Sequence, residues 1–504
     1  MRTTPDWSEE TPRATTGRRE SGCAVTSYAN ELSHREPEHT SGRGRFDRRQ
    51  PVWVIVAVLI AVEIISAFET SMMFAAIPTL ITDFDSDAST VGWAVTSFLL
   101  VAAASAAVCG RLGDMYGRER VLIVLLVVAA VGSIISAAGD SLTSIIVGRT
   151  IQGVAGAILP LCIGLAREHL PSGKVPVAVA LISGSAVAAG SASLLVAGLL
   201  IDYASWHMIF VVAAAYSVFA ILLVWFVLPW RPPTGTKEKI DYVGAVTFAA
   251  SVAAILLGVN KSQAWGWADG RTLGLIVGGA VVLVLLVRWE LRVPSPIINV
   301  RLFAGRKFSL TMLATVAIAA GPMGVATMII PIIMQTPTSD GFGLGLSATH
   351  AGWLSFIGSM FGFACTPLSG RISAAVGSRV SMLIGSILFV ASTVTMMTAH
   401  NSVVAMTAMV VVVSVATAFA YTALPNLIVE AVPERNTSEA TGTNAVLRTA
   451  GQGVGTSVAT MLLAFAATPI GGLNMIGVMF LVLAFIAIAL TVMIPRGVPD
   501  AVAS

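Results

Sequence analysis

The sequence predicts an all-α, polytopic membrane protein with fourteen transmembrane helices. Its 504 residues are 56% hydrophobic and only 11% charged, whereas soluble globular proteins carry about 25% charged residues. Fourteen stretches are apolar enough, and close enough to the length of about 20 residues that a span needs, to cross a bilayer. The net charge of +3 is small and gives no reason to expect nucleic-acid binding.

The predicted spans fall into two groups of six, separated by a pair. They cover residues 52–80, 90–109, 121–138, 142–166, 176–200, 207–228, 242–259, 272–288, 308–334, 349–369, 380–398, 402–429, 440–466 and 473–494. Residues 1–50 are polar and lack apolar periodicity, which is typical of a disordered tail. We therefore expect the following organisation: a cytoplasmic tail (1–50), a six-helix bundle (51–230), two inserted helices (231–300), a second six-helix bundle (301–496) and a short cytoplasmic tail (497–504).

The distribution of Lys and Arg predicts the orientation in the membrane. If the N-terminus is inside, the outer loops contain only Lys261 and Arg271, and the other loop Lys and Arg residues face the cytoplasm. Such an excess of positive charge marks the cytoplasmic side. An even number of spans then places both termini in the cytoplasm of a multi-pass plasma-membrane protein.

A charged stretch between the second and third spans, residues 110–120, predicts a tight loop at the membrane face. It reads Gly-Arg-Leu-Gly-Asp-Met-Tyr-Gly-Arg-Glu-Arg. Its glycines permit tight turning and close backbone approach, and Asp114 is a lone carboxylate that can pair with a helix end or a basic partner. The simpler alternative is a positively charged turn that only fixes orientation.

The pattern Gly-x-Leu-x-Asp-x-x-Gly-Arg resembles the loop signature of the major facilitator superfamily. This resemblance implies a conformational latch formed by Gly110, Asp114, Gly117 and Arg118. Part of the pattern recurs as Gly370-Arg371 and Gly377, with the same spacing and again between two spans. Two related halves of six helices are expected of facilitator transporters. The second copy lacks the aspartate.

Charged residues inside spans are costly and are therefore candidates for function. Phe68-Glu69-Thr70, followed by Pro78, resembles the first-helix motif of the fourteen-helix drug:proton antiporters. The resemblance implies that Glu69 carries the proton; the alternative is a carboxylate that faces water without exchanging protons. Glu63, about 120° away around the same helix, could line the other wall of a cavity, pair with an arginine or attract cationic substrates.

Gly148-Arg149-Thr150-Ile151-Gln152-Gly153 resembles the fourth-helix motif of the same transporters, in which the arginine takes part in proton transfer. A buried guanidinium stays charged and could influence a partner carboxylate, and Gln152 could hydrogen-bond it across helices. A structural arginine bound to backbone carbonyls is the alternative. In the fifth span, Ser193-Leu194 stand where the antiporter motif has Gly-Pro. The sequence therefore supports transport more strongly than it supports antiport.

Asn444, Arg448, Gly451 and Gly455 share one helical face, since residues three and four apart are neighbours on a helix. This stretch resembles the matching segment of the fourteen-helix branch. We interpret Asn444 and Arg448, with Gln152, as candidates for the substrate cavity or gate. Arg448 is a better candidate for an inner-face gate or a lipid-headgroup contact than for a substrate ligand.

The function predicted from these residues is proton-coupled export of hydrophobic or amphipathic small molecules, by a protein without catalytic residues. An exporter of a specific lipid, siderophore or metabolite is the alternative, and a membrane-embedded transferase a remote one, because the histidines lack paired acidic motifs. The four cysteines lie far apart, so no metal is expected, and the absence of a Walker-type sequence argues against ATP hydrolysis. The expected partners are a small-molecule substrate, protons and membrane lipids, with the chain a monomer and no cofactor.

Overall fold

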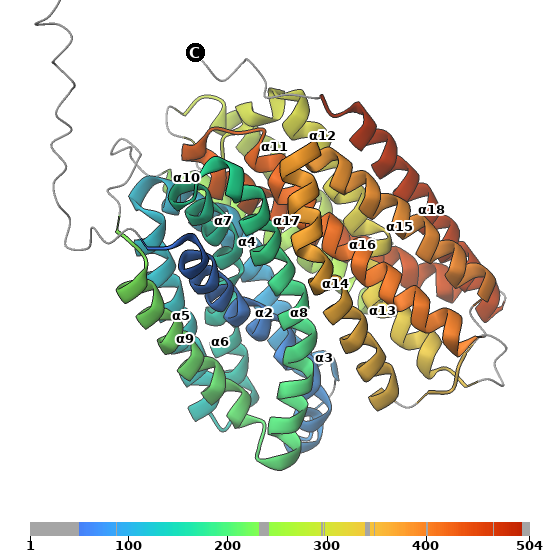
Figure 1. Ribbon diagram of the computed structural model, residues 1–504. Helices are drawn as coiled ribbons and strands as arrows, with labels where there is room; N and C mark the ends of the chain where they lie inside the picture. Colours follow the sequence, from blue (N-terminus) through green and yellow to red (C-terminus); the bar gives the residue numbers. More distant parts are fainter. Residues whose placement is uncertain are drawn as a thin grey trace, which may run out of the picture. The chain divides into compact units, whose positions relative to one another are not determined.

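The computed structural model describes residues 50–86, 88–230, 241–293, 296, 298–337, 343–346, 348–399, 402–466 and 468–495. Within these ranges every regular element is a helix (Figure 1). The predicted tails lie outside the described residues, apart from residue 50.

The helices follow the predicted spans. The first group is α2 (Val52–Asp83), the short α3 (Ala88–Val91), α4 (Trp93–Tyr116), α5 (Arg118–Ala138), α6 (Leu142–Gln152), α7 (Ile158–His169), α8 (Val175–Tyr203) and α9 (His207–Val227). The inserted pair is α10 (Tyr242–Trp265) and α11 (Gly270–Glu290). The last group is α12 (Arg306–Ala320), α13 (Pro322–Gln335), α14 (Ala348–Val376), α15 (Ser378–Ala399), α16 (Val403–Val429), α17 (Thr437–Phe465) and α18 (Pro469–Met493).

In the described ranges, 13 helices are long and apolar enough to cross a membrane. The remaining predicted span is α17, which has 29 residues but includes Glu439, Asn444 and Arg448 among many threonines and glycines. These polar residues lower its hydropathy while leaving its length sufficient for a span. The predicted all-α fold with fourteen membrane helices is confirmed.

Two spans are interrupted where the sequence requires it. The ninth span breaks at Gly321, and α13 begins with Pro322, because proline lacks the amide hydrogen that a continuous helix needs. The fourth span changes into a 3₁₀ turn over Gly153–Ala157 between α6 and α7. A Cβ on Gly156 would lie 2.6 Å from the Ala102 carbonyl oxygen, so this turn lets α4 approach closely.

The described helices have two main apolar cores. One consists almost entirely of residues from α2–α9, here called the first bundle. The other is built from α12–α18, here called the second bundle. Tyr421 of α16 packs against both cores. The exact boundaries of the bundles along the chain stay a prediction.

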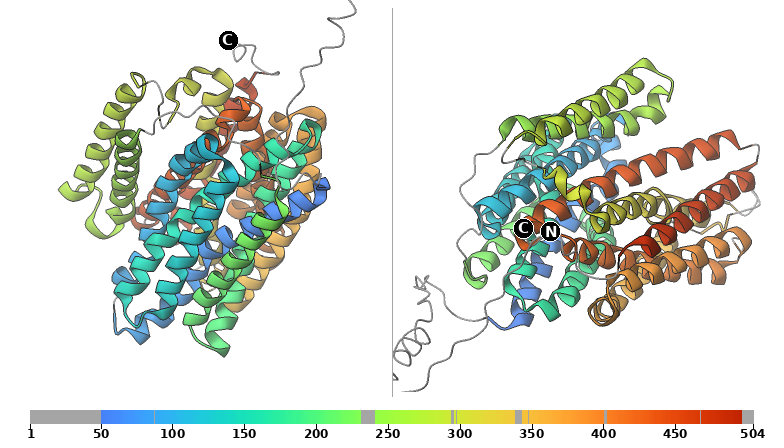
Figure 2. Two further views of the ribbon diagram at one scale, coloured as in Figure 1. Left: turned by 90° about the vertical axis from the view of Figure 1, so that its left-hand side faces the viewer. Right: turned by 90° about the horizontal axis from the view of Figure 1, so that it is seen from above.

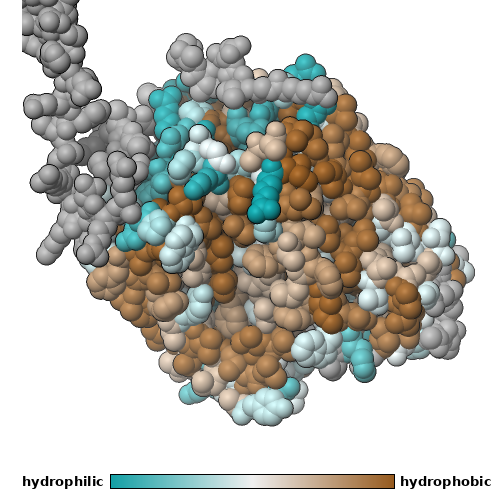
Figure 3. Space-filling model, in the orientation of Figure 1, coloured by the Kyte–Doolittle hydropathy of each residue, from teal (hydrophilic) through white to brown (hydrophobic). Residues whose placement is uncertain are grey.

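The α10–α11 hairpin lies at the edge of the described helices in both views of Figure 2. Phe248, Val252 and Leu256 of α10 pack against alanines of α4 and against Ala445 and Val446 of α17. Only 17% of the apolar 18-residue segment of α11 is buried against other helices, as expected for a helix with its outer face towards lipid. Apolar side chains also cover much of the face drawn in Figure 3, with hydrophilic ones concentrated at one end.

The predicted loop over 110–120 is wrong in its extent. Helix α4 continues through Gly110 to Tyr116, and α5 begins at Arg118. Gly117, with φ of 101°, is the only residue between the two helices, and glycine adopts this left-handed conformation without steric cost. The second copy repeats the arrangement, because α14 ends at Val376 and Gly377 has φ of 98°.

Candidate functional site

Arg149 occupies a closed site inside the first bundle. Its side chain is fully buried. Nη1 donates hydrogen bonds to the main-chain oxygen of Glu69 at 2.8 Å and to Oε1 of Gln152 at 3.0 Å. Nε donates to the main-chain oxygen of Ala94 at 3.3 Å, and the guanidinium lies 4.1 Å from the centroid of the Phe98 ring. Carbonyl oxygens and a ring face therefore hold this cation in place.

The side chain of Glu69, whose main-chain oxygen binds this arginine, is also fully buried. Ser133 of α5 donates to its Oε1 at 3.3 Å, and Gln152 donates to the Ser133 hydroxyl at 2.5 Å. Its Oε2 receives no hydrogen bond from any described residue. A chain of polar side chains thus connects Arg149, Gln152, Ser133 and Glu69, while one carboxylate oxygen is left without a donor.

The structure brings the predicted residues Glu69, Arg149 and Gln152 together. The Arg149–Gln152 hydrogen bond exists, but within α6 rather than across helices, because residues three apart share a helix face. The sequence patterns did not single out Ser133 or Phe98 as part of this site. A serine in an apolar span is too common to mark a site by itself.

Glu63 is six residues, or about 1.7 turns, before Glu69 on α2 and therefore points to a different place. Its side chain is 2% exposed, and its Oε2 accepts no hydrogen bond from the described residues. Arg448 of α17 attracts it electrostatically from the second bundle. The Arg448 guanidinium itself lies 4.2 Å from the centroid of the Tyr421 ring. A cation of the second bundle therefore acts electrostatically on a buried carboxyl group of the first.

Asp114 joins the two bundles at the end where α4 meets α17. Its Oδ1 accepts a hydrogen bond from Arg118 Nε at 2.9 Å. Its Oδ2 accepts the main-chain N–H of Glu439 at 3.0 Å, in the first turn of α17. A carboxylate at a helix N-terminus satisfies an otherwise unpaired amide and interacts favourably with the positive end of the helix dipole. The aspartate of the first bundle therefore caps a helix of the second.

Arg118 extends this connection. It donates to the main-chain oxygen of Glu434 at 2.6 Å and to Ser438 Oγ at 3.0 Å, both in the second bundle. It also pairs with Glu168 of α7 at 2.8 Å. A Cβ on Gly110 would lie 2.4 Å from the main-chain oxygen of Ser438, so only glycine permits this approach. The four predicted latch residues thus lie together where the bundles touch.

The sequence reading missed Glu439, which is 1% exposed and central to the same contact. It pairs with Arg111 at 3.4 Å and accepts Asn436 Nδ2 at 2.9 Å and the main-chain N–H of Asn299. The sequence pattern that could have indicated Glu439 is the Asn-x-x-Glu spacing from Asn436, which is typical of a helix start. Asn299 belongs to the segment after the inserted hairpin, so Glu439 connects that segment to the latch.

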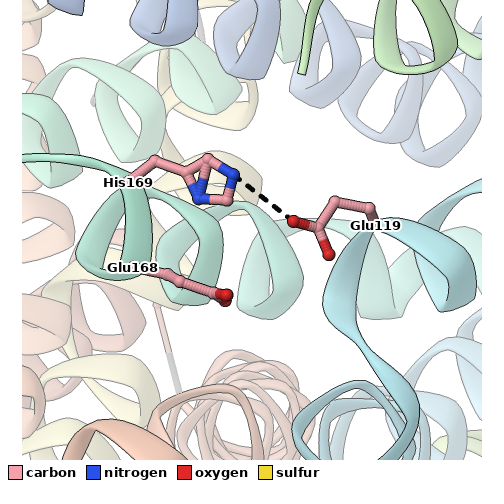
Figure 4. A group of neighbouring side chains, drawn as sticks. All are labelled: Glu119, Glu168 and His169. Carbon is pink, nitrogen blue, oxygen red and sulfur yellow. Dashed lines mark ion pairs between the residues drawn. The ribbon is translucent and has the colours of Figure 1, made fainter. Parts of the chain in front are cut away.

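Glu119, Glu168 and His169 form a compact group (Figure 4), which the Arg118–Glu168 ion pair connects to the latch. One ligand atom of each lies within 4.8 Å of the others, a spacing that could suit a metal ion. Existing contacts already use these atoms: His169 Nε2 lies 3.3 Å from Glu119 and 2.9 Å from the Pro229 carbonyl oxygen, and Glu168 binds Arg118. The group needs no ion to account for its geometry, and we assign none.

Asn444, a predicted cavity or gate residue, makes its contacts inside the second bundle. It donates to Thr315 Oγ1 at 2.6 Å and lies 3.7 Å from Met312 Sδ, both on α12. It is 2% exposed. Its role in a gate, like the roles of Gln152 and Arg448, stays a prediction.

The structure is that of a multi-span membrane protein with two apolar cores, a charged latch between them and buried charges within its spans. These features are those of a membrane transporter. The sequence profile of the Major Facilitator Superfamily matches residues 59–336 and again 312–503, and the chain belongs to this family. The crystal structure of the human organic anion transporter MFSD10 superposes with a TM-score of 0.64 at 14% identity, covering 87% of this chain and 100% of that one, which shows the shared fold.

Curated relatives include bacterial exporters. The chain is 26% identical over 368 residues to the tetracenomycin C resistance and export protein of Streptomyces glaucescens, covering 71% of this chain and 66% of that protein. It is 28% identical over 316 residues to the multidrug export protein EmrB of Haemophilus influenzae, covering 62% of this chain and 61% of that protein. The alignments thus span less than two thirds of these relatives.

Proposed function

We propose that this chain is a secondary active exporter, in which proton entry drives hydrophobic or amphipathic small molecules out of the cell by alternating access. Membership of a transporter family and the exporters among its relatives support the direction and the substrate class. A transmembrane potential favours this coupling, because one charge crossing 100 mV releases about 2.3 kcal/mol.

The observation that carries the proposal is the Glu69 carboxylate. It is fully buried, it has one oxygen without a hydrogen-bond donor among the described residues, and a fixed arginine binds the main-chain oxygen of the same residue. The carboxylate oxygen without a donor can accept a proton. Because Arg149 holds the main chain of Glu69 and Ser133 holds the carboxylate, a small movement of α2 against α5 and α6 would change the charge environment of the site. Such a change is what a proton carrier needs.

The latch supports the part of the proposal that concerns alternating access. Asp114 and Arg118 bind the first turn of α17 and the Glu434 carbonyl, so the bundles are closed against each other at this end. By the predicted orientation, this end is cytoplasmic. In the alternating-access cycle that we propose, these contacts break so that substrate can enter from the cytoplasm, and they form again when it leaves on the other side.

The test is efflux of a lipophilic cationic dye from cells that overproduce the protein, with and without a protonophore. We expect wild type to export the dye, the protonophore to stop export, and Glu69→Gln to be inactive at normal membrane abundance. Glu290→Gln is the matched control, because Glu290 is an equally buried glutamate in the inserted hairpin. It should export like wild type.

Each contrary result has a specific meaning. If Glu69→Gln exports as well as wild type, Glu69 does not carry the proton. If wild type exports no dye from a broad panel, the multidrug assignment fails, and a specific lipid, siderophore or metabolite becomes the better candidate for the same fold.

A further inference from the structure

The segment between the inserted hairpin and α12, residues 298–305, contacts the latch and is here called the strap. Its single helical turn covers Val300–Ala304. We propose that Glu439 couples the strap to the latch, so that the strap is released when the two bundles separate at this end and resists their separation while it is bound. The inference rests on the proposed alternating-access function and gives the inserted hairpin a part in it.

The Glu439 carboxylate binds three parts of the molecule at once. Its Oε1 accepts the main-chain N–H of Asn299 in the strap, and its Oε2 lies 3.4 Å from Nη1 of Arg111 on α4. Oε2 also accepts a hydrogen bond from Nδ2 of Asn436, at 2.9 Å, just before α17. A buried carboxylate is costly unless its oxygens have donors. Movement of α4 away from α17 therefore removes the arginine and opens this carboxylate to water.

The main chain of Glu439 belongs to the latch itself. Its N–H donates to Oδ2 of Asp114 at 3.0 Å, and the N–H of Ser438 lies 3.4 Å from Oδ1 of the same aspartate. One residue thus binds the first bundle through its amide and the strap through its side chain. When the bond to Asp114 breaks, the first turn of α17 loses its partner, and this turn carries the side chain that holds the strap.

The packing of the strap connects it to the hairpin at one end and to the second bundle at the other. Ile298 is buried in the apolar cluster that Phe248 of α10 forms with residues of α4 and α17. Leu302 packs against residues of the second bundle, and the ring centroids of Phe303 and Phe308, on α12, lie 5.0 Å apart. Because the hairpin also packs on α4 of the first bundle, separation of α4 from α17 must shift the hairpin or the strap.

A single amide distinguishes this coupling from ordinary packing. Asn299 binds Glu439 through its main chain, while its side-chain Oδ1 accepts no hydrogen bond from any described residue. Its φ of −73° is one that proline adopts. Asn299→Pro therefore removes the N–H at a compatible φ, whereas Asn299→Ala removes the side chain and keeps the N–H. The two variants form a matched pair.

The experiment measures amide hydrogen exchange by mass spectrometry, resolved to single residues, on the purified full chain in detergent. Asp114 holds the amide of Glu439, and the Glu439 carboxylate holds the amide of Asn299. Asp114→Asn should open the latch, and the distant Asn299 amide should then exchange about tenfold faster, as expected when a hydrogen bond to a charged group is lost. Ala374→Asp, at the exposed corresponding position of the second repeat, should leave both amides unchanged.

The coupling must also act in the opposite direction, because coupling between two sites is reciprocal. Asn299→Pro should therefore speed exchange of the Glu439 amide several-fold, and Asn299→Ala should leave it unchanged. Size-exclusion elution checks that each variant is folded. If Asn299→Pro does not fold, exchange of the Asn299 amide in Asp114→Asn and in Ala374→Asp decides the matter alone.

The inference is overturned if Asp114→Asn speeds exchange at Glu439 but not at Asn299, or if Asn299→Pro and Asn299→Ala affect Glu439 equally. If Asp114→Asn leaves Glu439 unchanged, the latch does not open as proposed, and the inference falls only if Asn299→Pro leaves Glu439 unchanged too. Exchange needs no transport. A protein that shows the coupling but fails the dye-efflux test would therefore retain the strap and lose only the proposed multidrug export.

Discussion

The two bundles contact each other along two interfaces, here called seams. Each seam includes one copy of the repeated Gly-Arg…Gly pattern, but the contacts in the two seams differ. In the latch seam, α4 packs against α17, and Asp114, Arg118 and Arg111 bind residues at the start of α17. In the second seam, α14 packs against α8. Its cross-bundle contacts include the hydrogen bond between Ser191 and Ser359, at 2.7 Å, and close packing of Gly370 on Val177. One seam is charged and the other is neutral.

The difference follows from two substitutions between the repeats. Ala374 stands at the position that corresponds to Asp114, and Ser378 at the one that corresponds to Arg118. Ser378 donates to Glu430 of its own bundle at 2.5 Å, whereas Arg118 crosses to the other. Buried charge pairs gain little net free energy, because desolvation offsets the attraction. In the alternating-access cycle proposed above, the charged seam would therefore be the one that separates, and the neutral seam would act as the hinge.

Among the tests that compare the two seams, the largest expected effect comes from removing the charge of Asp114. Asp114→Asn removes one of the two carboxylates that pair with Arg118. Breaking a buried ion pair in this way costs about 3–5 kcal/mol. We expect efflux to fall at least about tenfold and a cysteine at Ser438 to react faster with a membrane-permeant maleimide. Ala374→Asp is the matched control, because this position of the second repeat is exposed and should tolerate a carboxylate. Equal losses in both variants would remove the distinction between the seams.

A smaller effect is expected from Gly110→Ala. The added Cβ would lie 2.4 Å from the Ser438 main-chain oxygen, and a backbone atom cannot move aside as a side chain can. Overpacking costs about 1–3 kcal/mol, so the latch seam should close incompletely and efflux should decrease several-fold. Gly173→Ala, which meets no atom within 4 Å, should be silent. Wild-type efflux by Gly110→Ala would show that the seam is less tight than its geometry indicates.

The sequence predicted the fold well because a bilayer leaves few options for the backbone. Each span must satisfy its own amides as a helix, so length and apolar composition were enough to place all the spans, including the polar α17. The latch residues were found because their pattern is local. The extent of the predicted loop was wrong, because composition cannot show that α4 remains helical up to Gly117.

The partners of these residues could not be predicted in the same way. Asp114 binds the main chain of Glu439, 325 positions away, and no periodicity of one segment indicates which distant helix will pack against it. Ser133 is similar, because its importance depends on Glu69 and Gln152 lying beside it. Sequence patterns identified the charged residues that must have a role, and packing of the bundles determined which side chains they contact.

The smallest expected effect tests the neutral seam. Ser191→Ala removes one of the two hydroxyls that meet between α8 and α14, and hydrogen bonds between helices in membranes contribute about 0.6 kcal/mol on average. Ser359 also donates to Ser355 of its own helix, so it keeps a partner. We expect nearly unchanged efflux and a decrease of at most a few degrees in the thermal midpoint of the purified protein. The double variant with Ser359→Ala should be little worse than the single one, because the bond between the helices is already absent and the Ser359 hydroxyl otherwise binds only its own helix. A loss as large as that of Asp114→Asn would mean that the second seam also has to break and re-form during transport, and it could then not act as a hinge.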